Sequence, residues 1–245
     1  MQSLNFLELV SLQWLNNLIR YSLFAGGAFL IFWKWRMFPS FRRLYPMPQA
    51  QQIKKELFYS IRTTALFLIP TGIIIGLTEK GMTKIYLDLA DHSLGWYFLV
   101  FPVIFFTHET YFYWTHRFMH HSKVFPYLHS IHHESKDPSP LAAFSFDCGE
   151  ALVQSFVFIL ISVFIPTHYS HIFFFTIFSL GMNVYGHLGV EVLSDKCQKK
   201  TLLKSVNTPT SHSLHHKKYK GNYGLYVNWW DKWMKTEIVA TKGKD

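Results

Sequence analysis

The chain has 245 residues, of which 49% are hydrophobic and 18% aromatic, a composition that indicates one large membrane domain rather than a small soluble module. Its formal net charge is +9, and the basic residues flank apolar runs without forming a separate polar module, which favours anionic lipid headgroups over nucleic acid as partner. Cys148 and Cys197 form no CxxC pair, which argues against a disulfide framework and against a thiolate metal site.

Uncharged runs predict the helices in chain order. The first run, 9–33, is interrupted by Arg20 and predicts a helix that either spans the membrane or lies in its interface. The remaining four runs are close to the length that a membrane-spanning helix needs, although re-entrant hairpins stay an alternative. They are 63–78, 93–107, 151–167 and 172–186.

The charge pattern predicts how these helices are oriented. Segment 34–62, read as a loop, carries seven basic residues against the single acid Glu56, so the positive-inside rule places it in the cytoplasm. Two hairpins then follow, with the turns 79–92 and 168–171 on the opposite side, and segments 108–150 and 187–245 return to the cytoplasmic side. The N-terminus has no basic segment followed by a cleavage site, so no removable signal peptide is expected.

One domain, 1–245, therefore divides into five parts. These are an N-terminal helix and basic loop (1–62), a first hairpin (63–107), a histidine-rich segment (108–150), a second hairpin (151–186) and a C-terminal cap (187–245). The expected fold class is an all-α membrane protein with about four transmembrane helices in two hairpins and a cytosolic helical cap.

Histidines are concentrated in the parts expected on the cytosolic side. The stretch HRFMHHSKVFPYLHSIHH, 116–133, contains an HxxxH pair and an HxxHH motif, and SHSLHH, 211–216, repeats HxxHH. On a helix, residues three and four apart share one face. Ten histidines exceed the ligands that one metal takes, so two metal ions are the simpler expectation. The candidate ligands are His116, His120, His121, His129, His132, His133, His187, His212, His215 and His216.

These motifs, with ETYFYWTHR upstream and GNYGLYVNWWD downstream, resemble the fatty acid hydroxylase / sterol desaturase superfamily of integral-membrane di-iron enzymes. The resemblance covers about residues 105–237, and DPSPLAAFSF, after the second motif, is similar to the sterol C5-desaturase-like branch. It implies that the three histidine boxes and the isolated His187 hold two non-haem irons. It leaves open whether His120 or His121 is the ligand. It also implies that Glu109 orients a ligand imidazole, and it puts Asn183 where some relatives have a further histidine.

The resemblance implies an oxidoreductase that uses O2 and electrons to hydroxylate or desaturate an aliphatic C–H position of a lipid, such as a sterol, sphingolipid or alkyl lipid. Electrons are expected to come ultimately from NAD(P)H through a separate cytochrome b5- or ferredoxin-type donor with its reductase. Lysines of the cap, among them Lys217 and Lys220, are candidates for docking this donor, and membrane anchoring explains them equally well. The expected location is a bacterial inner membrane or the endoplasmic reticulum, with the histidines on the cytosolic face.

Two other classes of function use the same histidines. A membrane metal transporter would need polar ligands along the apolar runs, and those runs contain few. A zinc-dependent membrane hydrolase needs three or four ligands and leaves most of these histidines unused.

Overall fold

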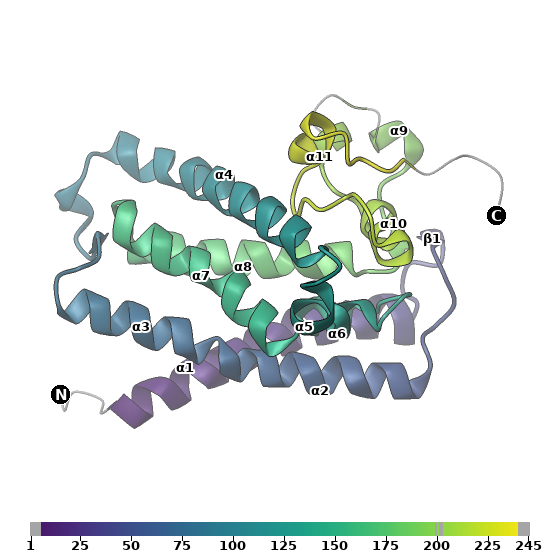
Figure 1. The fold of residues 1–245 in the computed structure, drawn as a ribbon, viewed down its shortest axis with the longest axis horizontal. Coiled ribbons are helices and arrows are strands. Elements are labelled where there is room, and N and C mark those ends of the chain that lie inside the picture. Colours follow the sequence, from purple (N-terminus) through teal and green to yellow (C-terminus); the bar gives the residue numbers. More distant parts are fainter. Residues whose placement is uncertain (1–5, 199, 201–202, 240–245) are drawn as a thin grey trace.

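The computed structural model describes residues 6–198, 200 and 203–239, and this part of the chain is mostly helical (Figure 1). The long helical elements are α1 (Phe6–Tyr21) with its π-helical continuations η1 (Ser22–Gly26) and η2 (Phe29–Lys34), α2 (Ala50–Leu66), α3 (Leu68–Glu79), α4 (Leu94–Met119), α7 (Cys148–Phe164) and α8 (Tyr169–Gly186). The short helices are α5 (Phe125–Leu128), α6 (Ser130–His133), α9 (Asp195–Gln198), α10 (Pro209–Lys218) and α11 (Trp229–Trp233), with 3-10 turns η3 (Leu89–Asp91), η4 (Pro140–Phe144) and η5 (Leu203–Ser205). Four two-residue strands are β1 (Arg42–Arg43), β2 (Ile85–Tyr86), β3 (Thr167–His168) and β4 (Val190–Glu191).

Each predicted apolar run is helical over all or nearly all of its length. Three boundaries differ from the sequence expectation, and one of them is the predicted turn 168–171, most of which is the first turn of α8. The segment predicted as the loop 34–62 contains most of α2, because from Ala50 onward apolar and polar side chains follow a helical period. In addition, α4 continues for more than three turns beyond the apolar run 93–107 and carries His116 directly.

Local signals at the helix ends agree with this assignment. The Ser93 side chain accepts a hydrogen bond from the backbone N–H of Trp96 at the start of α4. At the start of α10, Thr208 accepts from the N–H of Ser211 and Pro209 occupies the first turn, where a missing N–H costs no helical bond. Helix α10 ends at Tyr219, which has a left-handed backbone conformation with φ 60°.

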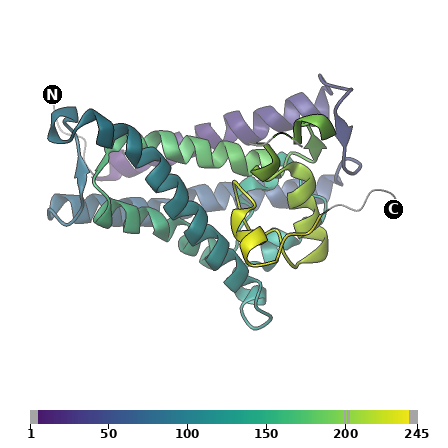
Figure 2. The ribbon, with the colours of Figure 1, turned by 90° about the horizontal axis from the view of Figure 1, so that it is seen from above.

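The long helices separate two sets of connecting segments (Figure 1). The α3–α4 and α7–α8 connections lie at one end of the molecule, and the segments that carry the histidine motifs lie at the other. At one end, β2 from the α3–α4 connection pairs in parallel with β3 from the α7–α8 connection, so the turns predicted to share a side do meet. At the other end lie α5, α6, α10 and α11, and Figure 2 shows the C-terminal segment beside the end of α4. The described histidines of the three motifs all belong to this second end.

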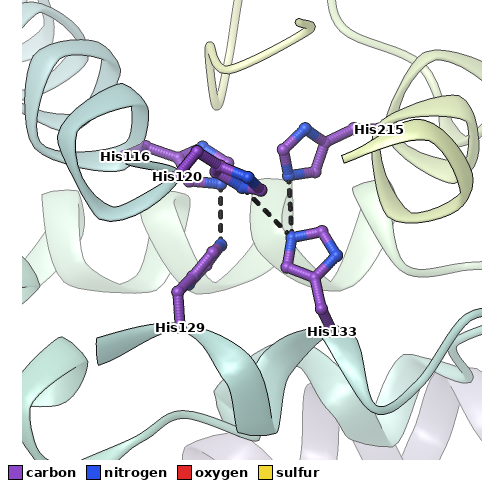
Figure 3. Close-up of side chains that lie close together, drawn as sticks. All are labelled: His116, His120, His129, His133 and His215. Carbon is purple, nitrogen blue, oxygen red and sulfur yellow. Dashed lines mark hydrogen bonds between the residues drawn. The ribbon is translucent and has the colours of Figure 1, made fainter. Parts of the chain in front are cut away.

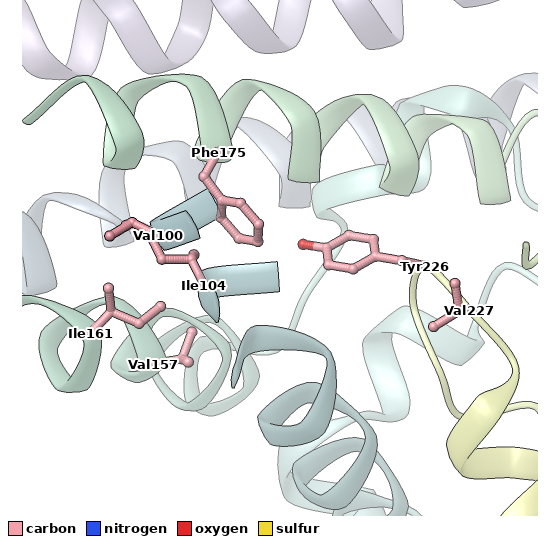
Figure 4. Packing of buried hydrophobic residues seen from close by; sticks show 7 residues of the cluster. All are labelled: Val100, Ile104, Val157, Ile161, Phe175, Tyr226 and Val227. Carbon is pink, nitrogen blue, oxygen red and sulfur yellow. The ribbon is translucent and has the colours of Figure 1, made fainter. Parts of the chain in front are cut away.

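The core between α4, α7 and α8 consists of interlocking aliphatic and aromatic side chains, including Ile104, Val157 and Phe175, and Tyr226 of the C-terminal segment closes it (Figure 4). Large apolar side chains also point outward, and Leu23, Phe98 and Phe164 are 67%, 67% and 66% exposed. Such an apolar outer surface is typical of a membrane protein.

Two helical stretches in the described residues, Leu7–Lys34 and Ala50–Glu79, are long and apolar enough to cross a membrane. Only 11% and 17% of their most apolar windows are buried inside the protein, unlike the core helix of a soluble domain. Run 9–33 therefore belongs to a helix of spanning length. The arrangement of about four spans in two hairpins stays a prediction.

The segment after the second histidine motif is fixed to the N-terminal helices by buried polar contacts. The Tyr21 and Ser60 hydroxyls both donate to the carbonyl of Leu141 at 2.8 Å, and the Tyr45 hydroxyl donates to that of Pro138 at 2.7 Å. The Ser139 hydroxyl donates to the buried Glu56 carboxylate. These contacts hold the connection from α6 to α7 and so set the position of the second histidine motif.

Candidate metal centre

Nine of the ten candidate histidines form two groups, and within each group one ring nitrogen of every residue lies within 4.8 Å of those of the others. The first group, which we call cluster A, contains five imidazoles from α4, the α5–α6 segment and α10 (Figure 3). The second, cluster B, contains four imidazoles from α6, the end of α8 and α10. Cluster A consists of His116, His120, His129, His133 and His215, and cluster B of His132, His187, His212 and His216.

The two HxxHH motifs contribute to the clusters in opposite ways. In the second motif His129 and His133 enter cluster A and His132 enters cluster B, whereas in the third motif His212 and His216 enter cluster B and His215 enters cluster A. The expectation that all imidazoles of one motif share a face is therefore wrong in detail. On α10 successive residues differ by about 100°, so His212 and His216 lie about 40° apart while His215 lies about 60° to the other side. In the second motif His129 precedes α6, and the adjacent His132 and His133 lie about 100° apart on that helix.

Three further positions from the sequence analysis lie outside both clusters. His121 is exposed, and its Nδ1 accepts from the backbone N–H of Lys123 at 3.4 Å. Asn183 donates through its carboxamide to the carbonyl of Ala143 at 2.6 Å. Glu109 accepts hydrogen bonds from the backbone N–H groups of residues 225–227 and bonds no ligand imidazole in any contact of the described residues.

Backbone carbonyls fix the protonation of the rings in both clusters. Nδ1 of His116 lies 2.8 Å from the carbonyl oxygen of Tyr223, and Nδ1 of His187 lies 2.8 Å from that of Asn183. Nδ1 of His215 is held in the same way by Gly221 at 2.8 Å. A carbonyl oxygen only accepts, so each Nδ1 carries the hydrogen, and Nε2 of the neutral ring turns a lone pair toward the cluster.

Burial keeps these rings neutral. It lowers the pKa of His129, His132 and His216 well below its usual value, and it lowers the pKa of His215 to about 4. Neutral imidazole is the form that binds metal ions.

The distances between the rings fit a shared cation in each cluster. Six Nε2–Nε2 distances, three in each cluster, lie between 2.9 and 3.4 Å. Two nitrogens bound about 2.1 Å from one metal at 90–109° are about 3.0–3.4 Å apart. Nε2 of His116 and Nε2 of His129 lie 2.9 Å apart, close to the separation of two ligand atoms on one cation. The residues present therefore fit two metal ions.

Glu150 is a site residue that the sequence reasoning missed. Its Oε1 lies 2.8 Å from Nδ1 of His129, and both side chains are only 2% exposed. A carboxyl group this close to Nδ1 limits how far the ring can turn, as the outer partners of metal-binding imidazoles do. The sequence does contain a signal for it. Glu150 immediately precedes the apolar run 151–167, and an ionisable group at such a position needs a specific partner.

Two buried acids hold the C-terminal segment that supplies the carbonyls of Gly221 and Tyr223. Asp231, fully buried, accepts from the N–H groups of Tyr223 and Gly224 at 2.9 Å and from the Thr236 hydroxyl at 2.7 Å. Glu109 accepts from the N–H of Tyr226 at 2.9 Å. The acids of the upstream and downstream motifs thus support cluster A from behind, while Tyr223 packs its ring against those of His116, His120 and His215.

Comparison with known proteins gives matches over the same region. The family model for fatty acid hydroxylase matches residues 101–236. The lathosterol oxidase of Rattus norvegicus is 28% identical over 232 residues, which are 92% of this chain and 74% of that protein. A Delta(7)-sterol 5(6)-desaturase of Gibberella zeae is 28% identical over 232 residues, 92% of this chain and 61% of that protein. The Homo sapiens lathosterol oxidase is 26% identical over 231 residues, 93% of this chain and 74% of that protein. No solved structure matches the chain.

Proposed function

Because this chain belongs to the fatty acid hydroxylase family and is an oxidoreductase related to sterol desaturases, we propose that it is a membrane-bound di-iron oxygenase of lipids. It uses O2 and externally supplied electrons to hydroxylate or desaturate an aliphatic C–H position. Its substrate is a sterol-like lipid, the class that its relatives' names indicate.

The single observation that carries this proposal is an apolar cavity whose lining includes aromatic side chains that contact both histidine clusters. The cavity, about 360 Å³, lies among α1, α3, α4, α7 and α8. Phe112 and Phe146 line it. The centroid of the Phe112 ring lies 5.1 Å from that of His116, and the centroid of the Phe146 ring lies 5.5 Å from that of His132. A lipid tail or ring in this cavity is separated from each cluster by one aromatic side chain.

In this proposal the five imidazoles of cluster A hold one iron and the four of cluster B hold the other. Iron supplies the reversible redox change that C–H oxidation requires and that no side chain offers. The protein's own contribution is positional. Carbonyls of Tyr223, Gly221 and Asn183 and the carboxylate of Glu150 orient the ligand rings. Phe112 and Phe146 keep bulk water away from the lipid side of the clusters.

A surface depression supports electron delivery to cluster A from outside the membrane. This depression, about 800 Å³, is lined by His120 together with Tyr219, Lys220 and Lys235. The lysines favour an acidic partner, and we propose that a cytochrome b5- or ferredoxin-type protein, reduced from NAD(P)H, docks here. By the positive-inside rule this end faces the cytosol, with the apolar helices spanning the membrane.

Reconstitution of the purified protein tests the proposal. With Fe(II), a reductant and lathosterol, the expected result is two irons per chain, lipid-dependent O2 consumption and an oxidised sterol detected by mass spectrometry. One zinc per chain with hydrolytic activity would instead support a zinc-dependent hydrolase. Metal flux across proteoliposomes without O2 consumption would support a transporter.

A further inference from the structure

The cavity contains one buried polar side chain without a partner. Gln154 on α7 lines the cavity and is 8% exposed, and neither its carboxamide nitrogen nor its carboxamide oxygen has a hydrogen-bond partner in the described structure. Leaving such a group unpaired is costly, so its retention in an apolar cavity indicates a ligand. By contrast, the neighbouring Ser155 hydroxyl, which also lines the cavity, donates to the carbonyl of Ala151 at 2.7 Å.

Gln154 lies close to the metal centre. It follows Glu150 by four residues on α7, so the two positions are about 6 Å apart along one face of the helix. Glu150 itself contacts His129 of cluster A. A ligand atom bonded to Gln154 is therefore near the place where the lipid meets the clusters, and not at the far end of the cavity.

The chemistry of this position selects a hydroxyl group. A carboxamide presents one acceptor and two donor hydrogens, and a hydroxyl both donates and accepts. A carboxylate or phosphate would need a cation, and two basic side chains line the cavity within the described residues. Nδ1 of His108 lies 3.2 Å from the Tyr226 hydroxyl, and the other basic side chain is Arg20. Its guanidinium is bonded to Thr176 at 2.8 Å and to Asn17 at 3.3 Å, and it stacks over Phe173.

We propose that Gln154 hydrogen-bonds the ring hydroxyl of a sterol held in this cavity and thereby positions the sterol carbon skeleton at the clusters. This inference rests on the proposed function. It also has a geometric consequence, because a ring hydroxyl near Glu150 brings the carbons a few bonds away from it closest to the metal centre. In a 3-hydroxysterol these are the carbons of the first two rings.

Equilibrium binding to the purified, iron-free full chain tests the role of Gln154 without relying on turnover. The probes are radiolabelled lathosterol and its 3-deoxy analogue. The variant Gln154→Leu keeps the side-chain volume and removes the hydrogen bonds, Gln154→Met is a second apolar substitution, and Ser155→Ala is the matched control. Wild type and Ser155→Ala are expected to bind lathosterol about tenfold more tightly than the deoxy analogue. Both Gln154 variants should lose this preference while binding the deoxy analogue as the wild type does.

Equal binding of the two probes by wild type, no sterol binding, or a preserved preference in a folded Gln154 variant would each overturn the inference. A thermal melt identifies misfolded variants. The outcome is separable from the proposed function. O2-dependent oxidation of a lipid without hydroxyl selectivity leaves the function standing and removes the role of Gln154. Hydroxyl-selective binding without bound iron or O2 consumption supports the role of Gln154 and removes the proposed oxygenase function.

Discussion

Oε1 of Glu150 lies 2.8 Å from Nδ1 of His129, and both side chains are buried where α7 begins. Removing the carboxylate leaves Nδ1 without this partner and frees the ring to turn. We expect Glu150→Ala to lower metal affinity or turnover by about 10- to 100-fold. Metal titration of the purified protein and the rate of lipid oxidation measure this. Glu134→Gln is the control, because Glu134 makes an exposed ion pair with Lys55 and should change either quantity little. A fully active Glu150→Ala protein would contradict the assigned role.

Adjacent histidines are expected to serve different metals. His132→Ala and His133→Ala should each reduce the metal content from two ions to about one, because His132 belongs to cluster B and His133 to cluster A. The double variant His132→Ala/His133→Ala should lose both ions, whereas His132→Ala/His212→Ala should lose only one. Elemental analysis of each purified variant gives the counts. His121→Ala should retain both metals and normal turnover, and a metal loss in that variant would move His121 into the ligand set.

Metal removal should lower stability, since neither cluster is expected to exist in the unfolded chain. At a free-metal concentration about 100 times the dissociation constant, each ion stabilises the folded state by about 2.7 kcal/mol. For a chain of this size that is a fall of about 5–10 °C in Tm per site on chelation. Thermal melts with and without chelator test this. The His132→Ala/His133→Ala variant should show no such shift, and an equal shift there would mean that the chelator acts elsewhere.

Asp231 should stabilise the segment that orients His116 and His215. Replacing it with Ala leaves the backbone N–H groups of Tyr223 and Gly224 buried without an acceptor. We expect a loss of about 3 kcal/mol in the free energy of unfolding, measured as a fall in Tm. Asp91→Ala is the control, because Asp91 is an exposed acidic residue in the α3–α4 connection and its removal should change the Tm little. A Tm within about 1 °C of wild type for Asp231→Ala would contradict the proposed support.

The proposed orientation in the membrane is tested by cysteine labelling. Cys148 is exposed at the histidine-bearing end, and Asp91 lies in the connection at the opposite end. A membrane-impermeant maleimide should label Cys148 only from the cytosolic side. In a Cys148→Ser/Cys197→Ser background, Asp91→Cys should be labelled only from the other side. Labelling of both positions from the same side would refute the two-hairpin arrangement.

Much of the fold followed from local pattern. Apolar runs such as 172–186 are helical because the backbone N–H and C=O groups of a segment in an apolar medium must be hydrogen-bonded within the protein. A helix satisfies all of them within the segment itself. The start of α2 at Ala50 was missed because basic residues among the apolar ones, Lys54 and Lys55, were read as loop charges. They lie instead along a helix that has one buried face.

The sequence by itself determined that imidazoles gather at one end of a helical membrane protein, because their spacing and the charge of the loops are local properties of the chain. Only the tertiary structure decided which histidine joins which cluster. His132 and His133 are neighbours that point to different groups, and their partners come from α4, α8 and α10, so the division depends on how those helices pack. The tertiary structure likewise brings Glu150 into contact with His129. These residues are 21 positions apart in the sequence, and no helical or strand periodicity predicts that they meet.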